Sequence, residues 1–336
     1  MSRWTFAYPL CTLNSPISPL FKFATVRNND GIWIFRENTS NDDRDYYKID
    51  VFLLEIDKQE VKKIECENMP NFDGSLQSAT AGHGDKLYVW ISEFHGLYSL
   101  YKFDTKTLQW TNFLSIDCMY MQCCQAKIIG DNMYVLQIDE LNENKLVVIN
   151  LISREIETTH DLEYMSFLEI LSVKDEKLYR INSEEDDQIV SVFENETFRE
   201  ISRKKVLNDY LSSKFVDNTE QEFIQLITLG KYGRISLDRF NIMTGEWTTS
   251  DIEMTRSKFR IFLPIAFEDM IYAIAKGAQE SNHQIRVLEL YPKLASICLL
   301  NLVEKLANKD ESDVEAVKSK LPIPLRTQLT NILAIQ

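Results

Sequence analysis

The chain has 336 residues, 44% of them hydrophobic, and its 51 acidic side chains outnumber 37 basic ones to give a formal net charge of −14. So acidic a protein repels nucleic acid unless basic residues are segregated, and the sequence contains no basic run of useful length. No apolar run approaches the roughly 20 residues of a membrane-spanning helix. We therefore expect neither nucleic acid nor a membrane as a partner.

The sequence offers no candidate for covalent or metal chemistry. Its six cysteines and four histidines lack the spacings of a zinc site or a disulfide framework, so we expect reduced thiols and no metal. No set of nucleophile, base and orienting group can be identified, which predicts a protein that is not an enzyme and uses no cofactor. The first residues also lack the charged start and apolar centre of a secretory signal, so we expect a cytoplasmic or nuclear location.

The N-terminal residues include the pair Trp4-Thr5, which returns as Trp110-Thr111 and again as Trp247-Thr248. The recurrence predicts a strand over residues 3 to 9 that is equivalent to strands later in the chain. Self-similarity of this kind is the sequence signature of a repeat architecture.

One strand of each repeat is marked by an acidic residue two or three positions before an apolar-aromatic pair. The aromatic residues of these pairs are Trp33, Tyr88, Tyr134, Tyr179 and Tyr272. Their spacings are 55, 46, 45 and 93 residues, so one copy is missing before Tyr272 and is expected near Phe223 to Leu226. We assign the nine extra residues of the first spacing to the polar run after Phe35, because loops lengthen at little entropic cost.

An eight-residue pattern keeps the same period. It reads apolar residue, Asp or Asn, two free positions, Thr or Ser, one free position, Gln or Glu, then Trp or Ile. Its three copies are FDTKTLQW at 103–110, INLISREI at 149–156 and FNIMTGEW at 240–247. They begin 46 and 91 residues apart, which is one period and then two. A period of this length built from strand-like pieces is typical of β-propeller blades, and the two patterns together predict six blades.

The sixth repeat lacks an outer strand of its own. In complete repeats the aromatic residue precedes the Trp or Ile of the eight-residue pattern by 22 residues, and the same step from Tyr272 reaches Leu294, where strand alternation has ended. We expect residues 3 to 9 to fill that place by pairing with the strand near Gln284 to Leu290. Such pairing closes the ring and leaves no free sheet edge.

These patterns resemble the kelch repeat, in which an apolar-aromatic strand precedes a strand that ends in Asp or Asn, followed by Thr and then Trp. The resemblance covers roughly residues 1 to 291, although single glycines such as Gly84 and Gly130 stand where kelch blades usually have paired glycines. It implies an all-β fold, a six-bladed kelch-like β-propeller over residues 1–291 closed by an N-terminal strand. A small C-terminal helical module over residues 292–336 is expected to follow.

Acidic side chains concentrate in the loops that leave the aromatic strands of the first, third and fourth blades. Because equivalent propeller loops emerge on one face, we expect an acidic arc around one end of the channel. Two interpretations stay open: solvated loop tips, or a rim that binds a basic peptide of a protein substrate. The candidate substrate-binding residues are Asp42, Asp43, Asp139, Glu140, Glu184, Glu185, Asp186 and Asp187.

After Tyr291-Pro292 the strand alternation ends and apolar residues recur at helical spacing. One stripe comprises Leu294, Cys298, Leu302 and Leu306. Ser312 with Glu315 predicts a capping box that opens a second helix. A third apolar series runs from Leu325 to Leu333.

This tail resembles a SOCS box or the related VHL box, the helical modules that join substrate receptors to elongin B and C and a cullin. Leu294, Cys298 and Leu302 occupy the first part of that motif, and Leu321-Pro322-Ile323-Pro324 matches the second part of the SOCS type. Leu321, Pro322, Leu325 and Leu329 also satisfy the VHL type, so the cullin stays ambiguous. The resemblance implies adaptor-binding residues Leu294, Cys298, Leu302, Leu321, Pro322, Pro324 and Leu325.

Two functions from different classes follow from these features. The first is a substrate-recognition subunit of a cullin-type ubiquitin ligase, in which the propeller binds a degradation signal and the tail binds the elongin adaptor. The alternative is a non-catalytic kelch-like scaffold whose leucine stripe packs on the propeller itself. An F-box-like helix set, based on LPIPLRTQL, is a third interpretation of the tail.

Overall fold

The computed structural model describes residues 7–13, 23–39, 47–56, 58, 60–70, 75–92, 97–117, 121–139, 143–162, 170–184, 187–205, 210–216, 223–230, 235–252, 259–267, 270–277, 283–289, 306, 311–318, 320–321 and 329. Strands account for most of these residues, and the helical ones lie near the C-terminus.

The described strands form six antiparallel sheets of four strands each, which we number in chain order. Sheet one comprises β2 (Phe23–Asn28), β3 (Gly31–Thr39), β4 (Tyr47–Glu55) and β5 (Glu60–Ile64). Sheet two comprises β6 (Ser75–His83), β7 (Lys86–Ser92), β8 (Leu97–Asp104) and β9 (Gln109–Asp117). Sheet three comprises β10 (Met121–Ile129), β11 (Asn132–Asp139), β12 (Asn144–Asn150) and β13 (Glu155–Leu162).

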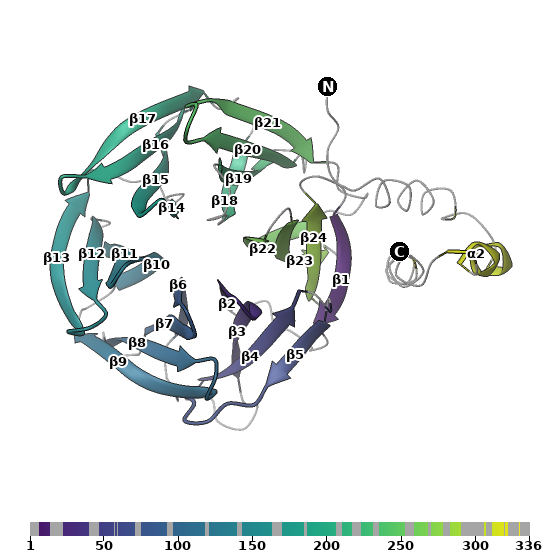
Figure 1. Ribbon diagram of the computed structural model, residues 1–336, viewed down its shortest axis with the longest axis horizontal. Coiled ribbons are helices and arrows are strands. Elements are labelled where there is room, and N and C mark those ends of the chain that lie inside the picture. The colour runs from purple at the N-terminus through teal and green to yellow at the C-terminus, as the bar shows by residue number, and fades with distance from the viewer. Residues whose placement is uncertain are drawn as a thin grey trace.

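The second half of the chain repeats this order. Sheet four comprises β14 (Ile170–Lys174), β15 (Lys177–Glu184), β16 (Asp187–Glu194) and β17 (Thr197–Lys205). Sheet five comprises β18 (Tyr210–Val216), β19 (Phe223–Gly230), β20 (Ile235–Asn241) and β21 (Trp247–Ile252). Sheet six comprises β22 (Phe259–Phe267), β23 (Met270–Gly277), β24 (His283–Glu289) and β1 (Ala7–Leu13). The sheets lie around a circle (Figure 1). The strands nearest the centre are β2, β6, β10, β14, β18 and β22.

The N-terminal strand β1 pairs with β24, the strand that was expected to receive it. The described pairing runs from Ala7 opposite Leu288 to Leu13 opposite His283, and residues 3 to 6 of the predicted strand lie outside the described part. The register shifts beside Pro9, which donates no backbone hydrogen bond. A proline is tolerated there because β1 lies at the outer edge of its sheet.

The predicted aromatic strands are the second strands of their sheets. Trp33, Tyr88, Tyr134, Tyr179 and Tyr272 lie in β3, β7, β11, β15 and β23, and β19 occupies the position predicted for the missing copy. The extra residues of the first repeat are shared between two places. In the first repeat, 22 residues separate Trp33 from the end of β4, whereas in the second repeat 16 residues separate Tyr88 from the end of β8. Six of the nine extra residues therefore lie near the predicted loop. The others fall between β5 and β6.

The eight-residue pattern forms the turn between the third and fourth strands of its sheet. In each copy the side-chain oxygen of the Asp or Asn accepts hydrogen bonds from backbone N–H groups two and three residues later, at 2.8 to 3.1 Å. Its backbone carbonyl accepts a third bond, at 2.8 to 2.9 Å, from the residue four later. That residue has a positive φ in all three copies: Leu108, Arg154 and Gly245.

The pattern is therefore a capped turn attached to a core residue. The leading apolar residues Phe103, Ile149 and Phe240 are buried, and the capping oxygen replaces strand hydrogen bonds that the turn cannot make. In the first copy, Asp104 also accepts a hydrogen bond from Lys86 on the neighbouring strand, and this bond lowers the pKa of Asp104 to about 2. The carboxylate thus stays ionised at any physiological pH.

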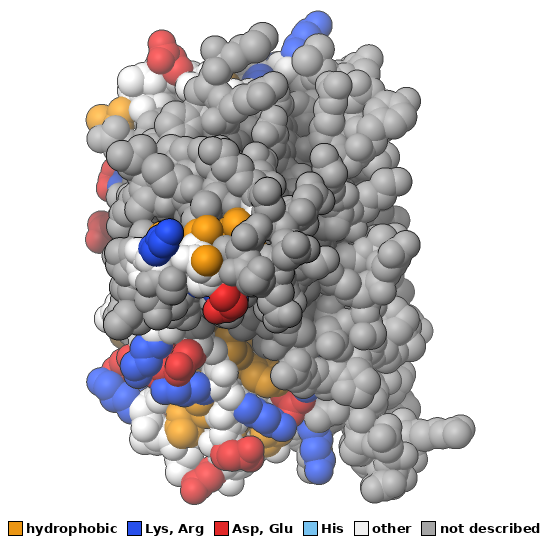
Figure 2. All heavy atoms as spheres, turned by 90° about the vertical axis from the view of Figure 1, so that its right-hand side faces the viewer, with side chains coloured by type: hydrophobic (Ala, Val, Ile, Leu, Met, Phe, Trp, Pro, Cys, Tyr) orange, Lys and Arg blue, Asp and Glu red, His pale blue; other side chains and the backbone are white. Residues whose placement is uncertain are grey.

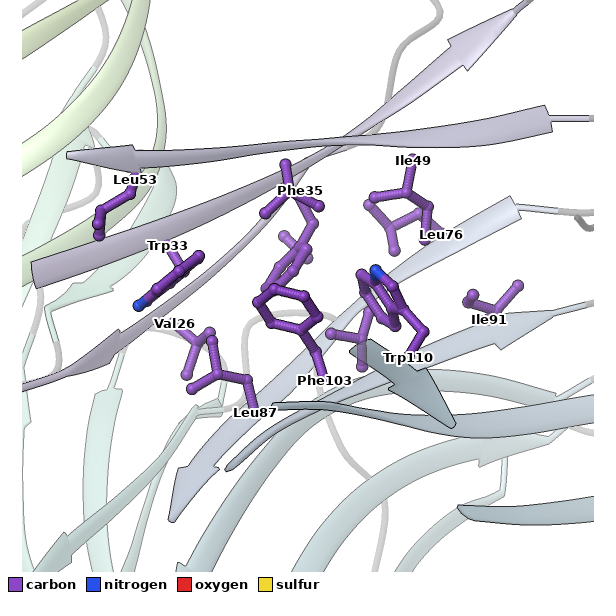
Figure 3. Packing of buried hydrophobic residues seen from close by; sticks show 13 residues of the cluster. Val26, Trp33, Phe35, Ile49, Leu53, Leu76, Leu87, Ile91, Phe103 and Trp110 are labelled. Carbon is purple, nitrogen blue, oxygen red and sulfur yellow. The ribbon is translucent and has the colours of Figure 1, made fainter. Parts of the chain in front are cut away.

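Adjacent sheets pack face to face through aromatic side chains. Trp33 meets Phe103 and Phe35 meets Trp110, in each case edge-on with ring centroids 5.4 Å apart (Figure 3). These four rings come from sheets one and two and belong to one buried cluster. Each such pair contributes about 0.5–1.5 kcal/mol beyond the area that it buries.

The C-terminal residues include α2 (Glu311–Lys318). The helix lies where the second helix was predicted, but Glu315 pairs with Lys318 at 2.8 Å and Ser312 lies inside the helix rather than before it. Leu306 and Leu329 are helical and buried. Across the described ranges, no helix is long and apolar enough to cross a membrane.

We expect Asn241→Ala to reduce the free energy of unfolding by about 1–2 kcal/mol, because two backbone donors lose their side-chain acceptor. Asn241→Asp keeps an acceptor oxygen in the same place and should retain most of the stability. Urea unfolding of both variants measures the difference. Equal losses in the two variants would show that the cap contributes nothing.

Candidate functional site

The structure places only part of the predicted acidic rim. Asp139 and Glu184 are the last residues of β11 and β15, and Asp187 is the first residue of β16. Because β11 and β15 are the second strands of neighbouring sheets, these ends lie at the same side of the ring. The other predicted rim residues lie outside the described part of the chain: Asp42, Asp43, Glu140, Glu185 and Asp186.

Asp187 is not a loop residue, contrary to the expectation from sequence. Strand pairing continues to the tip of the β15–β16 hairpin, where Glu184 lies opposite Asp187. Asp187 Oδ2 accepts a hydrogen bond from Arg203 Nη1 at 3.2 Å, and the Asp187 side chain is only 20% exposed. The sheet therefore holds this carboxylate, because a two-residue connection leaves no room for a longer loop.

Of the predicted adaptor-binding residues, Leu321 alone falls in the described part. It is half-buried, and its backbone N–H donates to the carbonyl of Lys318 at 3.1 Å, just after α2 ends. The remaining adaptor-binding residues lie outside the described ranges: Leu294, Cys298, Leu302, Pro322, Pro324 and Leu325.

Sheets three and four face each other through an apolar layer. Tyr134 of β11 meets Phe193 of β16 edge-on, with ring centroids 6.2 Å apart. Leu136 and Leu146 of sheet three pack with Leu178 of sheet four in one buried cluster. Since alternate residues of a strand share a face, these contacts identify which other side chains face the junction.

Polar side chains end this layer at the side of the ring where Asp139 and Glu184 lie. Asn144 is two residues from Leu146 on β12, and Asn182 is four residues from Leu178 on β15, so both face the junction. Asp187 is six residues from Phe193 on β16 and shares its face.

Asn144 and Asn182 also lie at the same level. Asn144 is opposite Ile138, which is four residues beyond Tyr134. Asn182 is opposite Ile189, which is four residues before Phe193 on the antiparallel strand β16. Because Tyr134 and Phe193 are in contact, equal steps along paired strands bring the two asparagines to equivalent positions on facing sheets.

Three buried oxygens at this polar end receive no hydrogen bond from the protein: Asn144 Oδ1, Asn182 Oδ1 and Asp187 Oδ1. We call them the acceptor cluster. Asn144 is only 4% exposed, and a buried acceptor without a donor costs about 1–3 kcal/mol, so each such group requires an explanation. The cluster is suited chemically to accept hydrogen bonds from a compact group that carries several donors.

Two observations on the described residues concern cysteine and metal chemistry. Burial raises the pKa of the Cys66 thiol to about 11, so the thiol stays protonated and is a poor nucleophile at neutral pH. Within the ranges that the structure describes, no group of three or more His, Cys, Asp or Glu side chains could hold a metal ion.

Charge is mixed on the side of the molecule that Figure 2 shows, where described acidic and basic side chains lie next to one another. Sheet one gives two examples of such pairing: Lys62 to Glu55 at 2.6 Å and Lys63 to Asp50 at 2.9 Å. Hydrogen bonds from Arg36 and Lys63 lower the pKa of Asp50 although its burial acts in the opposite direction. In these pairs each acidic side chain is neutralised locally by a basic neighbour.

No protein-family model matches the chain, and no curated protein matches it. Among solved structures, the SapL1 lectin in complex with alpha methyl fucoside is 11% identical, with a TM-score of 0.55 and coverage of 83% of this chain and 99% of the lectin chain. Trypanosoma rangeli sialidase in complex with 2,3-difluorosialic acid is also 11% identical, with a TM-score of 0.56 and coverage of 92% of this chain and 60% of the sialidase chain.

These similarities show the fold: the protein is a β-propeller built from four-stranded antiparallel sheets. They do not extend to function at such low identity, because one neighbour is a lectin and the other an enzyme. The kelch and SOCS-box or VHL-box resemblances have no counterpart among the family models.

Proposed function

We propose that the chain is a six-bladed kelch-like β-propeller with a C-terminal helical module, and that it acts as the substrate-recognition subunit of a cullin-type ubiquitin ligase. The propeller binds a basic segment of a protein substrate at the side where β11 and β15 end. The C-terminal module binds elongin B and C. The chain itself performs no chemistry, and it accelerates transfer by holding the substrate near a charged ubiquitin carrier.

The observation that carries the second half of this proposal is the position of α2. The helix lies outside the ring, apart from the strands of sheet six (Figure 1). A tail that served only to cover the propeller would lie against a sheet face, as the scaffold alternative requires. Leu306 and Leu329 are buried, and the proposal assigns the partner contact to other apolar residues of the tail.

The described topology supports the ring as a recognition platform. The sheets repeat one strand order, and β1 completes the sheet that contains β24, so the first and last strands of the propeller are in contact. Closure of this kind leaves the connections between second and third strands on one side of a rigid scaffold. Binding residues are commonly found on such loops.

Adaptor binding is tested with the full-length double variant Leu294→Pro, Cys298→Phe. We expect the parent protein to bind purified elongin B and C at micromolar concentration and the variant to lose binding, because a proline breaks the helix and a phenylalanine blocks a narrow pocket. The propeller should keep its melting temperature. Glu315→Gln serves as a control, since it removes the ion pair with Lys318 at its exposed member without touching the proposed stripe.

The scaffold alternative predicts the opposite effects on elongin binding and on stability. The parent protein would then ignore elongin, and the double variant would lose several kcal/mol of stability as a leucine stripe left the propeller surface. Either result contradicts the ligase function.

Ring closure is tested by deleting residues 1–13, which removes β1. We expect a loss of several kcal/mol and increased aggregation, because β24 loses its partner and becomes a free sheet edge. Thermal unfolding and light scattering measure the two effects. An unchanged melting temperature with a monomeric product would contradict the closure.

The acidic rim is tested by charge reversal of Glu184, Glu185 and Asp186 to lysine, with Asp187 left intact because Arg203 depends on it. We expect association with a basic peptide to weaken and its salt dependence to flatten. A charge-matched control reverses Asp175, Glu176 and Glu196, which lie in turns at the other end of the same sheet. Equal effects of the two triple variants would show that only net charge matters.

A further inference from the structure

We propose that the acceptor cluster binds the ε-ammonium group of a lysine side chain that enters between sheets three and four from the acidic side of the ring. This inference rests on the proposed recognition of a basic segment, and it names the side chain that anchors the segment. Its starting point is the three buried oxygens without a protein donor: Asn144 Oδ1, Asn182 Oδ1 and Asp187 Oδ1.

The kind of these atoms suits an ammonium group that enters from the acidic side: Asn144 and Asn182 lie at one level, and Asp187, opposite Glu184, lies two residues nearer the strand ends. All three are acceptors, and a lysine ammonium carries three donors on a compact, flexible stem. Asp187 supplies a carboxylate oxygen while Arg203 binds its other oxygen, so one negative charge is held in place at the junction. The two amide oxygens lie further in and offer acceptors without adding charge.

The surrounding sequence favours a cation over a neutral donor. Residues 139–145 and 184–187, which flank the cluster, contain seven acidic side chains and one basic one. Arg180 faces the same junction, but its guanidinium lies over the Phe198 ring at 5.2 Å, deeper in the apolar layer. A cation that approaches this side is therefore attracted before it reaches the buried oxygens.

A metal ion fits these atoms less well. Calcium takes six to eight oxygen ligands, usually with several carboxylates. The cluster has three oxygens, of which one is anionic, and the described residues contain no larger group of acidic ligands. An ammonium group requires no more than the three acceptors that are present.

The test separates hydrogen bonding from charge on both partners. The probes are two synthetic peptides, acetyl-hexalysine amide and the same peptide with every lysine Nε-trimethylated, which keeps the charge but has no N–H donor. The variants are Asn182→Leu and Asn144→Leu, which change no charge. Gln188→Leu is the matched control, because Gln188 is buried with an unbonded Oε1 on the opposite face of β16.

We expect wild-type protein to bind hexalysine about tenfold more tightly than the trimethylated peptide in calorimetry, and each Asn→Leu variant to remove that preference. The control variant should keep it. The Asn→Leu variants should also melt at or above the wild-type temperature, because an unpaired buried acceptor has been removed. Calcium chloride alone should give no heat of binding.

Four results would overturn the inference: equal binding of the two peptides by wild-type protein, an unchanged preference in both asparagine variants, loss of the preference in Gln188→Leu, or saturable calcium binding. Lower melting temperatures in both asparagine variants would also count against it, because the oxygens would then be hydrogen-bonded in the free protein. If Asn182→Leu fails to fold, Asn144→Leu and the comparison of the two peptides on wild-type protein still decide the question.

Failure here is distinguishable from failure of the proposed function. Elongin binding by the parent protein is measured separately and does not involve the acceptor cluster. A protein that binds elongin and basic peptides without preferring free lysine refutes the inference alone. A protein that prefers hexalysine but ignores elongin refutes the ligase function and leaves the lysine site standing.

Discussion

The fold depends on the need of each four-stranded sheet to be covered on both faces. Trp33 and Phe35 of sheet one are buried only because Phe103 and Trp110 of sheet two lie against them. Sheet two in turn covers sheet three through its opposite face, where Tyr88 and Trp90 belong to a separate cluster. A single sheet of this kind could not bury enough apolar area to be stable, so the sheets stabilise one another around the ring.

This arrangement divides the molecule into two sides with different roles. On one side, the turns between third and fourth strands of sheets two, three and five are closed by side-chain oxygens and residues of positive φ, with nearly the same geometry in each. Asp85 and Asp131, in the turns before the second strands, accept backbone hydrogen bonds from these same turns at 2.9 and 2.8 Å. That side is used for structure. The other side, where the second and third strands connect, is free to vary in length and charge.

The junction between sheets three and four has a structural part and a variable part. Its deeper part is an apolar layer like those between other sheets, with Tyr134, Phe193 and the surrounding leucines in contact. Its outer part carries two amides and a carboxylate, and one side-chain oxygen of each accepts no hydrogen bond from the protein. At the junction between sheets four and five, by contrast, the buried Asp238 carboxylate accepts hydrogen bonds from Lys204 and from Thr249, both at 2.5 Å.

Local interactions explain why much of the fold could be predicted from sequence. The eight-residue pattern encodes a turn whose hydrogen bonds all lie within five residues, so it repeats visibly along the chain. The aromatic residues mark the second strand of each sheet because that strand is covered on both faces and needs large apolar side chains. The partner of the N-terminal strand followed from counting repeats, although its register did not, because Pro9 shifts the pairing locally.

Only the tertiary structure brought Asn144 and Asn182 to one junction, and no feature of either residue in the sequence marked it. They are 38 residues apart in the sequence. Whether they lie near each other depends on which face of each strand turns toward the neighbouring sheet and on how the two sheets are aligned along their strands. The same holds for Asp187, which the sequence placed in a loop and strand pairing placed in a sheet. The sequence by itself determined the repeat, because a repeat is built from short-range hydrogen bonds and apolar spacing. The packing of one sheet on the next decided the candidate site, because contacts between particular polar residues of two faces are long-range and belong to one junction rather than to the repeat.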